Sequence, residues 1–434
     1  MCTFWRHQPL LRIFCLSNKL RQLKKLSRLF AGGKITLYQP IILYRKFTAD
    51  KVFNGYELLN GNYVLITDAD GVVTDLIDEK DAGENIEVFK GIISPGLINA
   101  HCHLELSQLK NVIPTGTGLV QFVQQVMGNR ALLNEAKIAA MRLAEQEMYN
   151  SGVVAVGDIC NTADSLIIKK ESKIHWHNFI EVSGFVDVVA AKRLADANLI
   201  YQDFLLNKFD KTSLSPHAPY SVSKTLFTEL NASTTGKLIT IHNQECTAED
   251  ELYFNKTGNF LELYKNFGID ISSFVPTGKT SFESWLPYFT NGQAIISVHN
   301  TFTNQADINF YKNQSAAAQL YFCICINANK YIEQKAPPIE LFRKNNCPMV
   351  IGTDSYASNW QLNIWDEIKA IQLETNFKIP LSEILQWATI NGARALQIEN
   401  SAGSFEKGKK PGIVLIEGLE DLNSTKQSVA KRIL

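Results

Sequence analysis

The feature that most constrains the fold is a set of short apolar runs, each followed by a polar side chain that carries a lone pair. Leu238–Ile241, Ala294–Val298 and Met349–Gly352 are runs of this kind. The polar residues that end or follow such runs are His101, His103, His242, His299 and Asp354. Parallel strands give this pattern when an active site is built at their carboxyl ends.

The middle of the chain alternates between strand-like and helix-like segments. Segment 119–149, for example, has apolar residues at the three- and four-residue spacing of an amphipathic helix. The predicted strands are Ile92–Ala100, Val153–Ile159, Ile174–Val182, Thr212–Pro216, Leu238–Ile241, Ala294–Val298, Leu320–Ile326 and Met349–Gly352. This alternation predicts an α/β fold, a (β/α)8 TIM-like barrel over residues 91–399. A doubly wound open sheet is the rival fold, but it usually has a glycine-rich turn after its first strand, where this chain has His-Cys-His.

Both flanking segments, residues 35–90 and 400–434, have short β-like runs separated by turn residues. Ile35–Tyr38, Tyr63–Thr67 and Val72–Leu76 belong to the first, and Asp70-Gly71 is a favourable hairpin turn. The last part of the chain has Ile413–Ile416 and a further strand near Val429. We expect the two ends to pair into one small β domain, into which the large domain is inserted.

Residues 1–34 are basic and contain no acidic residue. A targeting or membrane-surface helix is one interpretation of this segment. The apolar run Leu10–Leu16 is interrupted by Arg12 and is short for a signal peptide. We therefore favour a tail that lies outside the fold.

Charge and cysteine usage exclude several classes of protein. The formal net charge is zero, so no overall field attracts nucleic acid or an acidic membrane surface. The 8 cysteines include no C-x-x-C pair, which argues against a zinc site made of thiolates. Unpaired cysteines in a large enzyme are typical of the reduced cytoplasm. No apolar run is long enough to predict a transmembrane helix.

His101 and His103 have the spacing of two ligands for one metal ion. In a strand, side chains two residues apart point the same way, so both imidazoles can face one ion. An H-x-H pair is weak evidence by itself, because His175 and His177 form another pair that we interpret as part of a strand. His242 supplies a third nitrogen and Asp354 an oxygen. This donor set suits one Zn²⁺, or Fe²⁺, with a position left for water.

Glu245, His299 and Asp354 are the candidate catalytic residues. Glu245 can carry a proton to a leaving or ring nitrogen, although a solvated glutamate at the start of the acidic run 245–251 is the alternative. His299 can polarise the attacking water, although a histidine buried in the core is the alternative interpretation. Asp354 can take the proton of the water, although a structural role as a helix N-cap is the alternative interpretation. The candidate substrate contacts are His217, Arg130, Asn327 and Trp360.

Taken together, these motifs resemble the amidohydrolase superfamily, in its branch of metal-dependent deaminases and chlorohydrolases. The resemblance covers about residues 35–418 and includes Pro95-Gly-Leu-Ile-Asn-Ala-His-Cys-His103, Ser215-Pro-His-Ala-Pro-Tyr220, His242-x-x-Glu245, Val298-His-Asn300 and Gly352-Thr-Asp-Ser355. It implies a β-sandwich beside the barrel, His101, His103, His242 and Asp354 as metal ligands, and Glu245 and His299 as catalytic groups. It also carries the expectation of a homodimer. Thr212–His217 lacks the lysine that often bridges two ions in such barrels, which favours a single metal.

Within that branch the chain is most similar to two kinds of enzyme. One is the aminofutalosine deaminases, and the other is the adenosine-type deaminases that act on S-adenosylhomocysteine or methylthioadenosine. Cys325-Ile-Asn-Ala-Asn329 departs from the Cys-Pro-x-Ser-Asn segment of such enzymes, which puts the loop after the seventh strand in doubt. The resulting hypothesis is a zinc-dependent deaminase of a 6-aminopurine nucleoside. Hydrolysis of a cyclic amide or of a carbon–halogen bond would use the same site and is the alternative. A non-catalytic scaffold is the remote alternative.

Overall fold

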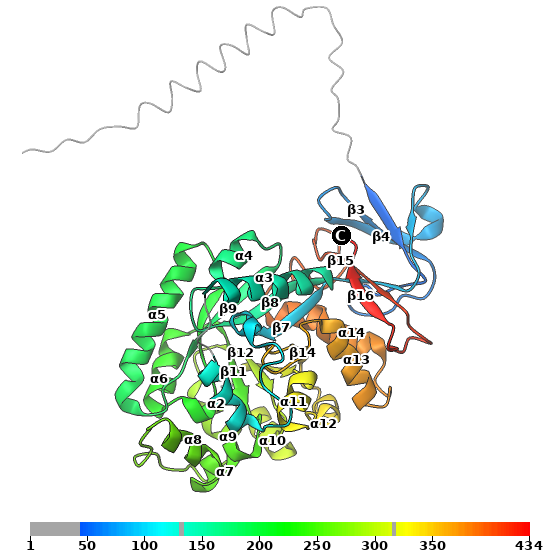
Figure 1. The fold of residues 1–434 in the computed structure, drawn as a ribbon. Coiled ribbons are helices and arrows are strands. Elements are labelled where there is room, and N and C mark those ends of the chain that lie inside the picture. Colours follow the sequence, from blue (N-terminus) through cyan, green and yellow to red (C-terminus); the bar gives the residue numbers. More distant parts are fainter. Residues whose placement is uncertain (1–43, 130–133, 315–317) are drawn as a thin grey trace, which may run out of the picture. The chain divides into compact units, whose positions relative to one another are not determined.

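Eight parallel strands form the centre of the computed structural model, which describes residues 44–129, 134–314 and 318–434 (Figure 1). They form two four-stranded sheets, β10-β9-β8-β7 and β11-β12-β13-β14. The strands are β7 (Leu97–Cys102), β8 (Val153–Cys160), β9 (His175–Val182), β10 (Thr212–Pro216), β11 (Leu238–Asn243), β12 (Ala294–His299), β13 (Gln319–Ile324) and β14 (Met349–Ile351). The prediction of an α/β fold with parallel strands is therefore confirmed.

Hydrogen bonds also join the two parallel sheets at both of their seams. At one seam, the backbone N–H groups of Thr353 and Asp354 donate to the carbonyl of His101, at 3.0 and 3.1 Å. At the other seam, the backbone N–H of His242 donates to the carbonyl of His217 at 2.9 Å. Both seams thus bring candidate site residues together, and the first seam joins residues from distant parts of the chain.

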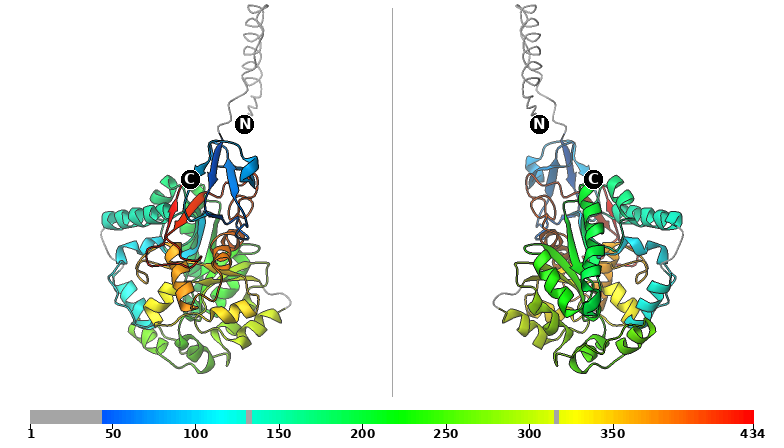
Figure 2. Two further views of the ribbon diagram at one scale, coloured as in Figure 1. Left: turned by 90° about the vertical axis from the view of Figure 1, so that its right-hand side faces the viewer. Right: turned by 90° about the vertical axis from the view of Figure 1, so that its left-hand side faces the viewer.

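Helices follow most of the parallel strands and lie outside the sheets (Figures 1 and 2). They are α2 (Leu119–Asn129), α3 (Asn134–Asn150), α4 (Leu166–Glu171), α5 (Ala190–Leu206), α6 (Lys224–Ser233), α7 (Thr247–Asn255), α8 (Phe260–Asn266), α9 (Ser281–Trp285), α10 (Gln305–Lys312), α11 (Ile326–Glu333), α12 (Ile339–Lys344), α13 (Ile364–Glu374), α14 (Leu381–Ala388) and α15 (Ile390–Ala395). Among the described residues, none of the helices is long and apolar enough to cross a bilayer.

Two small sheets are built from the two ends of the described chain, blue and red in Figure 2; one has N-terminal strands alone and the other has strands from both ends. Their orders are β4-β3-β1-β5 and β16-β15-β6-β2. The strands are β1 (Arg45–Thr48), β2 (Lys51–Val52), β3 (Tyr63–Thr67), β4 (Val73–Asp78), β5 (Glu87–Val88), β6 (Ile92–Pro95), β15 (Ile413–Glu417) and β16 (Val429–Arg432). One cluster of buried residues, including Phe47, Leu65, Ile93 and Leu415, draws on both sheets.

The first predicted strand, Ile92–Ala100, is two strands in the structure. Ile92–Pro95 pairs with β15 in a small sheet, whereas Leu97–Cys102 pairs with β8 in a parallel sheet. Gly96 lies at the change of sheet, where an added Cβ would come within 2.5 Å of the carbonyl oxygen of Pro411. Proline lacks an N–H group for continuous pairing, and glycine permits the close approach of backbone. The predicted strand Ile35–Tyr38 and the basic tail 1–34 lie outside the described residues.

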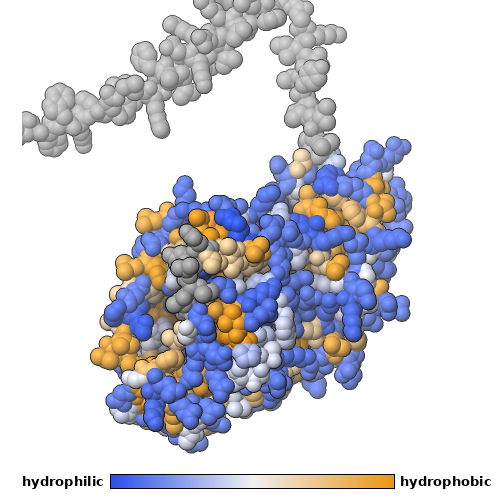
Figure 3. Space-filling model, viewed as in Figure 1, coloured by the Kyte–Doolittle hydropathy of each residue, from blue (hydrophilic) through white to orange (hydrophobic). Residues whose placement is uncertain are grey.

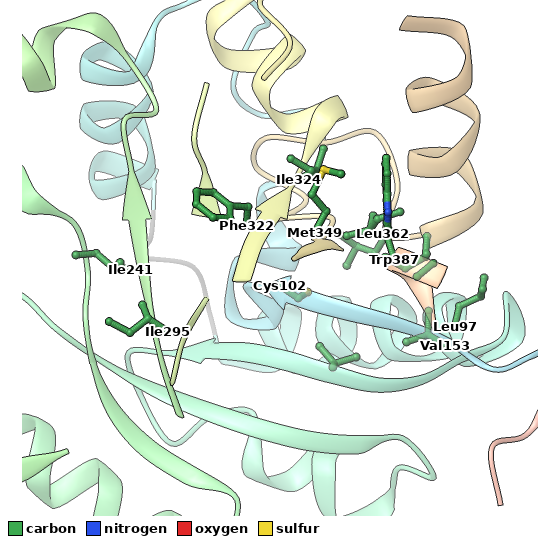
Figure 4. Packing of buried hydrophobic residues seen from close by; sticks show 14 of the residues in the cluster. Leu97, Cys102, Val153, Ile241, Ile295, Phe322, Ile324, Met349, Leu362 and Trp387 are labelled. Carbon is green, nitrogen blue, oxygen red and sulfur yellow. The ribbon is translucent and has the colours of Figure 1, made fainter. Parts of the chain in front are cut away.

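Apolar side chains from the parallel strands pack against the helices behind them. Figure 4 shows Ile241, Ile295 and Phe322 from three neighbouring strands, with Trp387 of α14 in the same cluster. Each of the three strand residues is fully buried. The surface in the view of Figure 3 is mostly hydrophilic, with hydrophobic residues in small separate groups. The apolar core therefore lies behind the strands and leaves their carboxyl ends for polar residues.

The seam between β7 and β14 depends on Asn99, a fully buried residue of β7. Its amide nitrogen donates to the hydroxyl of Thr353 at 2.7 Å, and its amide oxygen accepts the backbone N–H of Thr353 at 3.1 Å. Asn99→Ala removes both of these hydrogen bonds and leaves a cavity in a buried seam, so we expect the free energy of unfolding to fall by about 2 kcal/mol in urea titrations. The exposed Asn266 provides the control, since Asn266→Ala should change stability by less than about 0.5 kcal/mol. Equal stability of the two variants would contradict this role for Asn99.

Candidate metal centre and active site

Five buried side chains converge at the carboxyl ends of the parallel strands: His101, His103, His242, His299 and Asp354. The Nε2 atoms of His103 and His242 are 3.2 Å apart. Oδ1 of Asp354 lies 3.3 Å from Nε2 of His103 and 3.6 Å from Nε2 of His101. The ring centroids of His101 and His299 are 6.0 Å apart. Residues separated by more than 250 positions in the sequence thus share one small volume.

Backbone and amide acceptors determine which imidazole nitrogens face the centre of this cluster. Nδ1 of His242 lies 2.8 Å from the carbonyl oxygen of His217. Because a carbonyl only accepts, Nδ1 of His242 carries the proton and Nε2 keeps its lone pair. Nδ1 of His299 lies 3.4 Å from the amide oxygen of Asn329, which orients that ring in the same way.

Burial keeps the imidazoles neutral. It lowers the pKa of His103 to about 4, against the opposing effect of the negative charge of Asp354. Burial also lowers the pKa of His299 to about 4 and that of His242 well below its usual value. Neutral imidazoles with free lone pairs are the form of histidine that binds metals.

Asp354 remains ionised within this cluster. Burial alone would raise its pKa, but the imidazoles of His101, His103 and His299 lower it below the usual range. Its Oδ2 accepts a hydrogen bond from the hydroxyl of Ser358. The backbone of Asp354 has a φ of 58°, in the left-handed region, directly beyond β14. A strained backbone of this kind commonly occurs at functional sites.

The donor set fits a single divalent cation. Two groups of residues place ligand atoms within 4.8 Å of one another, His101 with His242 and His299, and His101 with His103 and Asp354. Both ring nitrogens of His101 are buried without a hydrogen-bond partner among the described residues. Unpaired buried polar atoms are costly, and a cation bound to the imidazole would remove that cost. Three nitrogens and a carboxylate oxygen match the preference of zinc.

Glu245 lies beside His299, with Oε1 of Glu245 3.5 Å from Nε2 of the ring. Burial, with the negative charges of Asp354 and Glu249, raises the pKa of Glu245 well above its usual value. The carboxylate of Glu249 accepts the backbone N–H groups of Gln244 and Glu245, at 2.9 and 2.7 Å. A buried carboxyl group on a turn that is held by hydrogen bonds can stay protonated and donate a proton.

A cavity of about 500 Å³ opens onto this cluster. His103, His242, Glu245, His299 and Asp354 line its inner end. Glu181, His217 and Asn161 add polar groups to its wall. The rest of the lining is largely apolar and includes Leu119, Phe122, Val126, Phe185, Leu263 and Ile269. The cavity is therefore suited to a molecule with a polar reactive end and an apolar end.

The candidate substrate contacts have different positions in the structure. His217 lines the cavity. Asn327 does not, and its side chain donates to the carboxylate of Glu367 at 2.8 Å. Trp360 packs against Tyr331 and is 49% exposed, outside the cavity lining. Arg130 lies outside the described residues.

Two features of this region were absent from the sequence predictions. Glu181 is the penultimate residue of β9, so the rule that drew attention to His242 would also have selected it. Behind the site, Asp158 and Lys169 form a fully buried ion pair with an N–O distance of 2.6 Å. Oδ1 of Asp158 accepts the backbone N–H of Leu104 at 2.8 Å and so holds the residue that follows His103. Sequence spacing carries no signal for that pair.

Comparison with known proteins agrees with the geometry. Residues 92–432 match the model of the Amidohydrolase family. A Helicobacter pylori protein named adenosine deaminase is 27% identical over 349 residues, which cover 79% of this chain and 83% of that protein. A 5-methylthioadenosine/S-adenosylhomocysteine deaminase of Thermoanaerobacter pseudethanolicus is also 27% identical, over 76% of this chain and 74% of that protein.

Two solved structures share the fold. Aminofutalosine deaminase of Helicobacter pylori in complex with methylthio-coformycin superposes with a TM-score of 0.74 at 24% identity, over 90% of this chain and all of that chain (100%). An adenosine deaminase of Xanthomonas campestris with bound zinc has a TM-score of 0.67 at 20% identity, over 86% and 84% of the two chains.

The ligand assignment predicts the effect of removing single donors. We expect His242→Ala and Asp354→Ala to weaken metal binding by on the order of 100-fold, because each removes one of four donors to a buried cation. Elemental analysis of the purified variants measures this effect. His175→Ala is the matched control, since this exposed histidine belongs to the other H-x-H pair. Full metal occupancy in both of the first two variants would refute the assignment.

Proposed function

This chain belongs to the amidohydrolase family, and we propose that it is a metal-dependent hydrolase that removes the amino group of a 6-aminopurine nucleoside. The observation that carries the proposal is the cluster of three imidazoles and Asp354, with Glu245 and His299 beside it, at the inner end of the cavity. Relatives named as deaminases of adenosine and of methylthioadenosine support the same chemistry.

Four residues would hold the metal: His101, His103, His242 and Asp354. Zinc is the metal we propose, with Fe²⁺ as the alternative, because imidazole and carboxylate donors suit both. When bound, such a cation supplies Lewis acidity that makes water a competent nucleophile near neutral pH. The chain supplies everything else that the reaction needs: binding, orientation and proton transfer.

Deamination replaces the exocyclic C6–N bond with a C6–O bond, and ammonia leaves. Asp354 is ionised, so its carboxylate can accept a proton from the attacking water and pass it to the leaving nitrogen. Burial raises the pKa of Glu245 well above its usual value, so its carboxyl group can donate a proton to the ring nitrogen beside C6 and regain one from the hydroxyl that has added to C6. His299, 3.5 Å from Glu245, is placed to accept a hydrogen bond from the water that adds to C6. Acid–base assistance of this kind contributes on the order of 10²–10⁴-fold to the rate.

The apolar part of the cavity favours nucleosides that carry an apolar 5′ substituent. Phe122, Val126 and Phe185 line it, and none of them can pair with a hydrophilic 5′ group. Methylthioadenosine, which has an apolar methylthio group at this position, appears in the name of a relative. His217, which lines the same cavity, would hold the base or the sugar.

We also infer the finer architecture that accompanies this function. The eight parallel strands would close into a (β/α)8 barrel over residues 91–399, since hydrogen bonds cross both seams. Residues 35–90 and 400–434 would form a composite β-sandwich, with Ile92–Pro95 as an additional strand. A homodimer and a cytoplasmic location stay predictions.

The catalytic role of Glu245 predicts a loss of rate without a loss of metal. Glu245→Gln keeps the shape of the side chain but cannot deliver a carboxyl proton, so we expect kcat to fall by on the order of 10²–10⁴-fold. Metal content, measured on the same sample, should stay at the wild-type level. Glu229→Gln, on an exposed position of α6, is the control and should retain full activity. Wild-type activity of Glu245→Gln would remove Glu245 from the mechanism.

The apolar cavity wall predicts the order of substrates. We expect kcat/KM for methylthioadenosine to exceed that for adenosine by about tenfold or more, because burial of a methylthio group contributes about 1–2 kcal/mol. Ammonia release from adenosine, methylthioadenosine, S-adenosylhomocysteine and aminodeoxyfutalosine measures the order. A preference for adenosine over all three others would contradict an apolar 5′ subsite. Release of ammonia from none of them would exclude the proposed reaction and favour a cyclic amide or halide as substrate.

A further inference from the structure

Gln244 contributes a fully buried amide side chain to the turn that carries Glu245. β11 ends at Asn243, so Gln244 is the first residue beyond the strand and directly precedes Glu245. Its side chain is buried, and its backbone has a φ of 44°, in the left-handed region. A glutamine in this conformation costs free energy, which the surrounding contacts must offset.

Both polar atoms of the amide group have partners on other elements. Oε1 of Gln244 accepts a hydrogen bond from the hydroxyl of Thr303, beyond β12, at 2.6 Å. Nε2 donates to Oδ2 of Asp307, in α10, at 3.1 Å, and to Oδ2 of Asp250, in α7, at 3.4 Å. An amide presents an acceptor and a donor side by side, which suits a place between a hydroxyl group and two carboxylates.

The backbone of this turn forms bonds to the same neighbouring elements. The N–H of Gln244 donates to Oε2 of Glu249, in α7, at 2.9 Å, and its carbonyl accepts the N–H of Phe302 at 3.1 Å. One residue earlier, the carbonyl of Asn243 accepts the N–H of Asn300 at 2.9 Å. Main-chain and side-chain hydrogen bonds therefore join the end of β11 to the turn after β12.

The two strand ends that Gln244 joins carry two candidate catalytic groups that face each other. Glu245 follows Gln244, and His299 is the last residue of β12. Oε1 of Glu245 lies 3.5 Å from Nε2 of His299. Because the two groups come from different strands, their separation depends on how the strand ends are fixed to each other. A shift of about 1 Å in a catalytic group can lower the rate on the order of 100-fold.

We propose that Gln244 is a positioning residue: it ties the turn of Glu245 to the turn after β12 and so holds the carboxyl group of Glu245 where it can donate a proton to the substrate. Gln244 is not part of the cavity lining, so it acts through Glu245 and not by contact with the substrate. This inference rests on the proposed deamination, and it adds how the proton donor of that reaction is kept in place.

The first experiment compares two buried glutamines in the metal-loaded protein. Gln244→Met keeps the length of the side chain and removes its amide bonds, so we expect kcat to fall about 10- to 100-fold, with KM changed by less than about threefold and metal content unchanged. Gln293→Met is the matched control, because Gln293 is buried, donates to Oδ1 of Asn231 at 2.9 Å and lies at the other end of β12. Gln293→Met should lose stability in urea titrations and keep the wild-type kcat.

The second experiment combines the change with Glu245→Gln. A residue that acts through Glu245 has little effect once the carboxylic acid is gone, so Gln244→Met should lower the remaining kcat of Glu245→Gln by less than about threefold. A merely structural role would lower it by the same factor as in the wild-type background, and that result overturns the proposal. A wild-type kcat in Gln244→Met, or an equal loss of kcat in Gln293→Met, overturns it as well.

A second variant keeps the proposal testable if Gln244→Met does not fold. Thr303→Val removes the hydroxyl that donates to Oε1 of Gln244, so it should lower kcat in the same pattern, whereas Thr303→Ser keeps the hydroxyl and should retain activity. Full activity of Thr303→Val would then overturn the proposal. All of these results leave the deaminase function intact. No ammonia from any nucleoside with the wild-type protein, despite full metal content, overturns the proposed function and this inference with it.

Discussion

Lone pairs of buried imidazoles, gathered at the carboxyl ends of the parallel strands, set the chemistry of this protein. Both nitrogens of His101 lack a hydrogen-bond partner in the part of the chain that the structure describes, and Nε2 of His103 faces Nε2 of His242 at 3.2 Å. At most one proton can lie between two neutral imidazole nitrogens in contact, so the two rings form no more than one hydrogen bond with each other. A bound cation can accept the lone pairs of all these imidazoles at once. Asp354, held ionised by the same histidines, supplies the negative charge that completes the donor set.

Hydrogen bonds on the side away from the cluster orient these donors. The carbonyl of His217 fixes the ring of His242, and Asn329 lies behind His299. Asn99 ties β7 to the residue before Asp354, and Asp158 holds the backbone that follows His103. Asp158 is itself neutralised by Lys169, and both side chains are fully buried. Breaking a buried pair of this kind is strongly destabilising, so the pair also limits how far the segment after His103 can move.

The cavity lining has a polar part and an apolar part. The ionisable groups in the lining are those of the candidate metal site and also Glu181, His217 and Arg193, whereas Phe122, Val126 and Phe185 are apolar. A nucleoside combines groups of both kinds: a base with a reactive amino group, a sugar with hydroxyls and a variable 5′ substituent. The proposed deamination uses the first of these groups.

Sequence alone located the strands that carry the site, because a residue directly after an apolar strand lies at the carboxyl end of that strand. That reasoning identified His101, His103, His242, His299 and Asp354 as neighbours, although His242 and Asp354 are separated by more than one hundred positions. It missed the change of sheet at Gly96, because a continuous apolar run gives no sign of which sheet each half joins. It also placed Asn327 and Trp360 among the substrate contacts; in the structure the side chain of Asn327 donates to Glu367, and Trp360 is half exposed. Only the tertiary structure decided which lone pairs point inward, that Glu181 stands beside His217, and that Lys169 neutralises Asp158, because these contacts depend on side-chain directions between strands, which spacing along the chain does not encode.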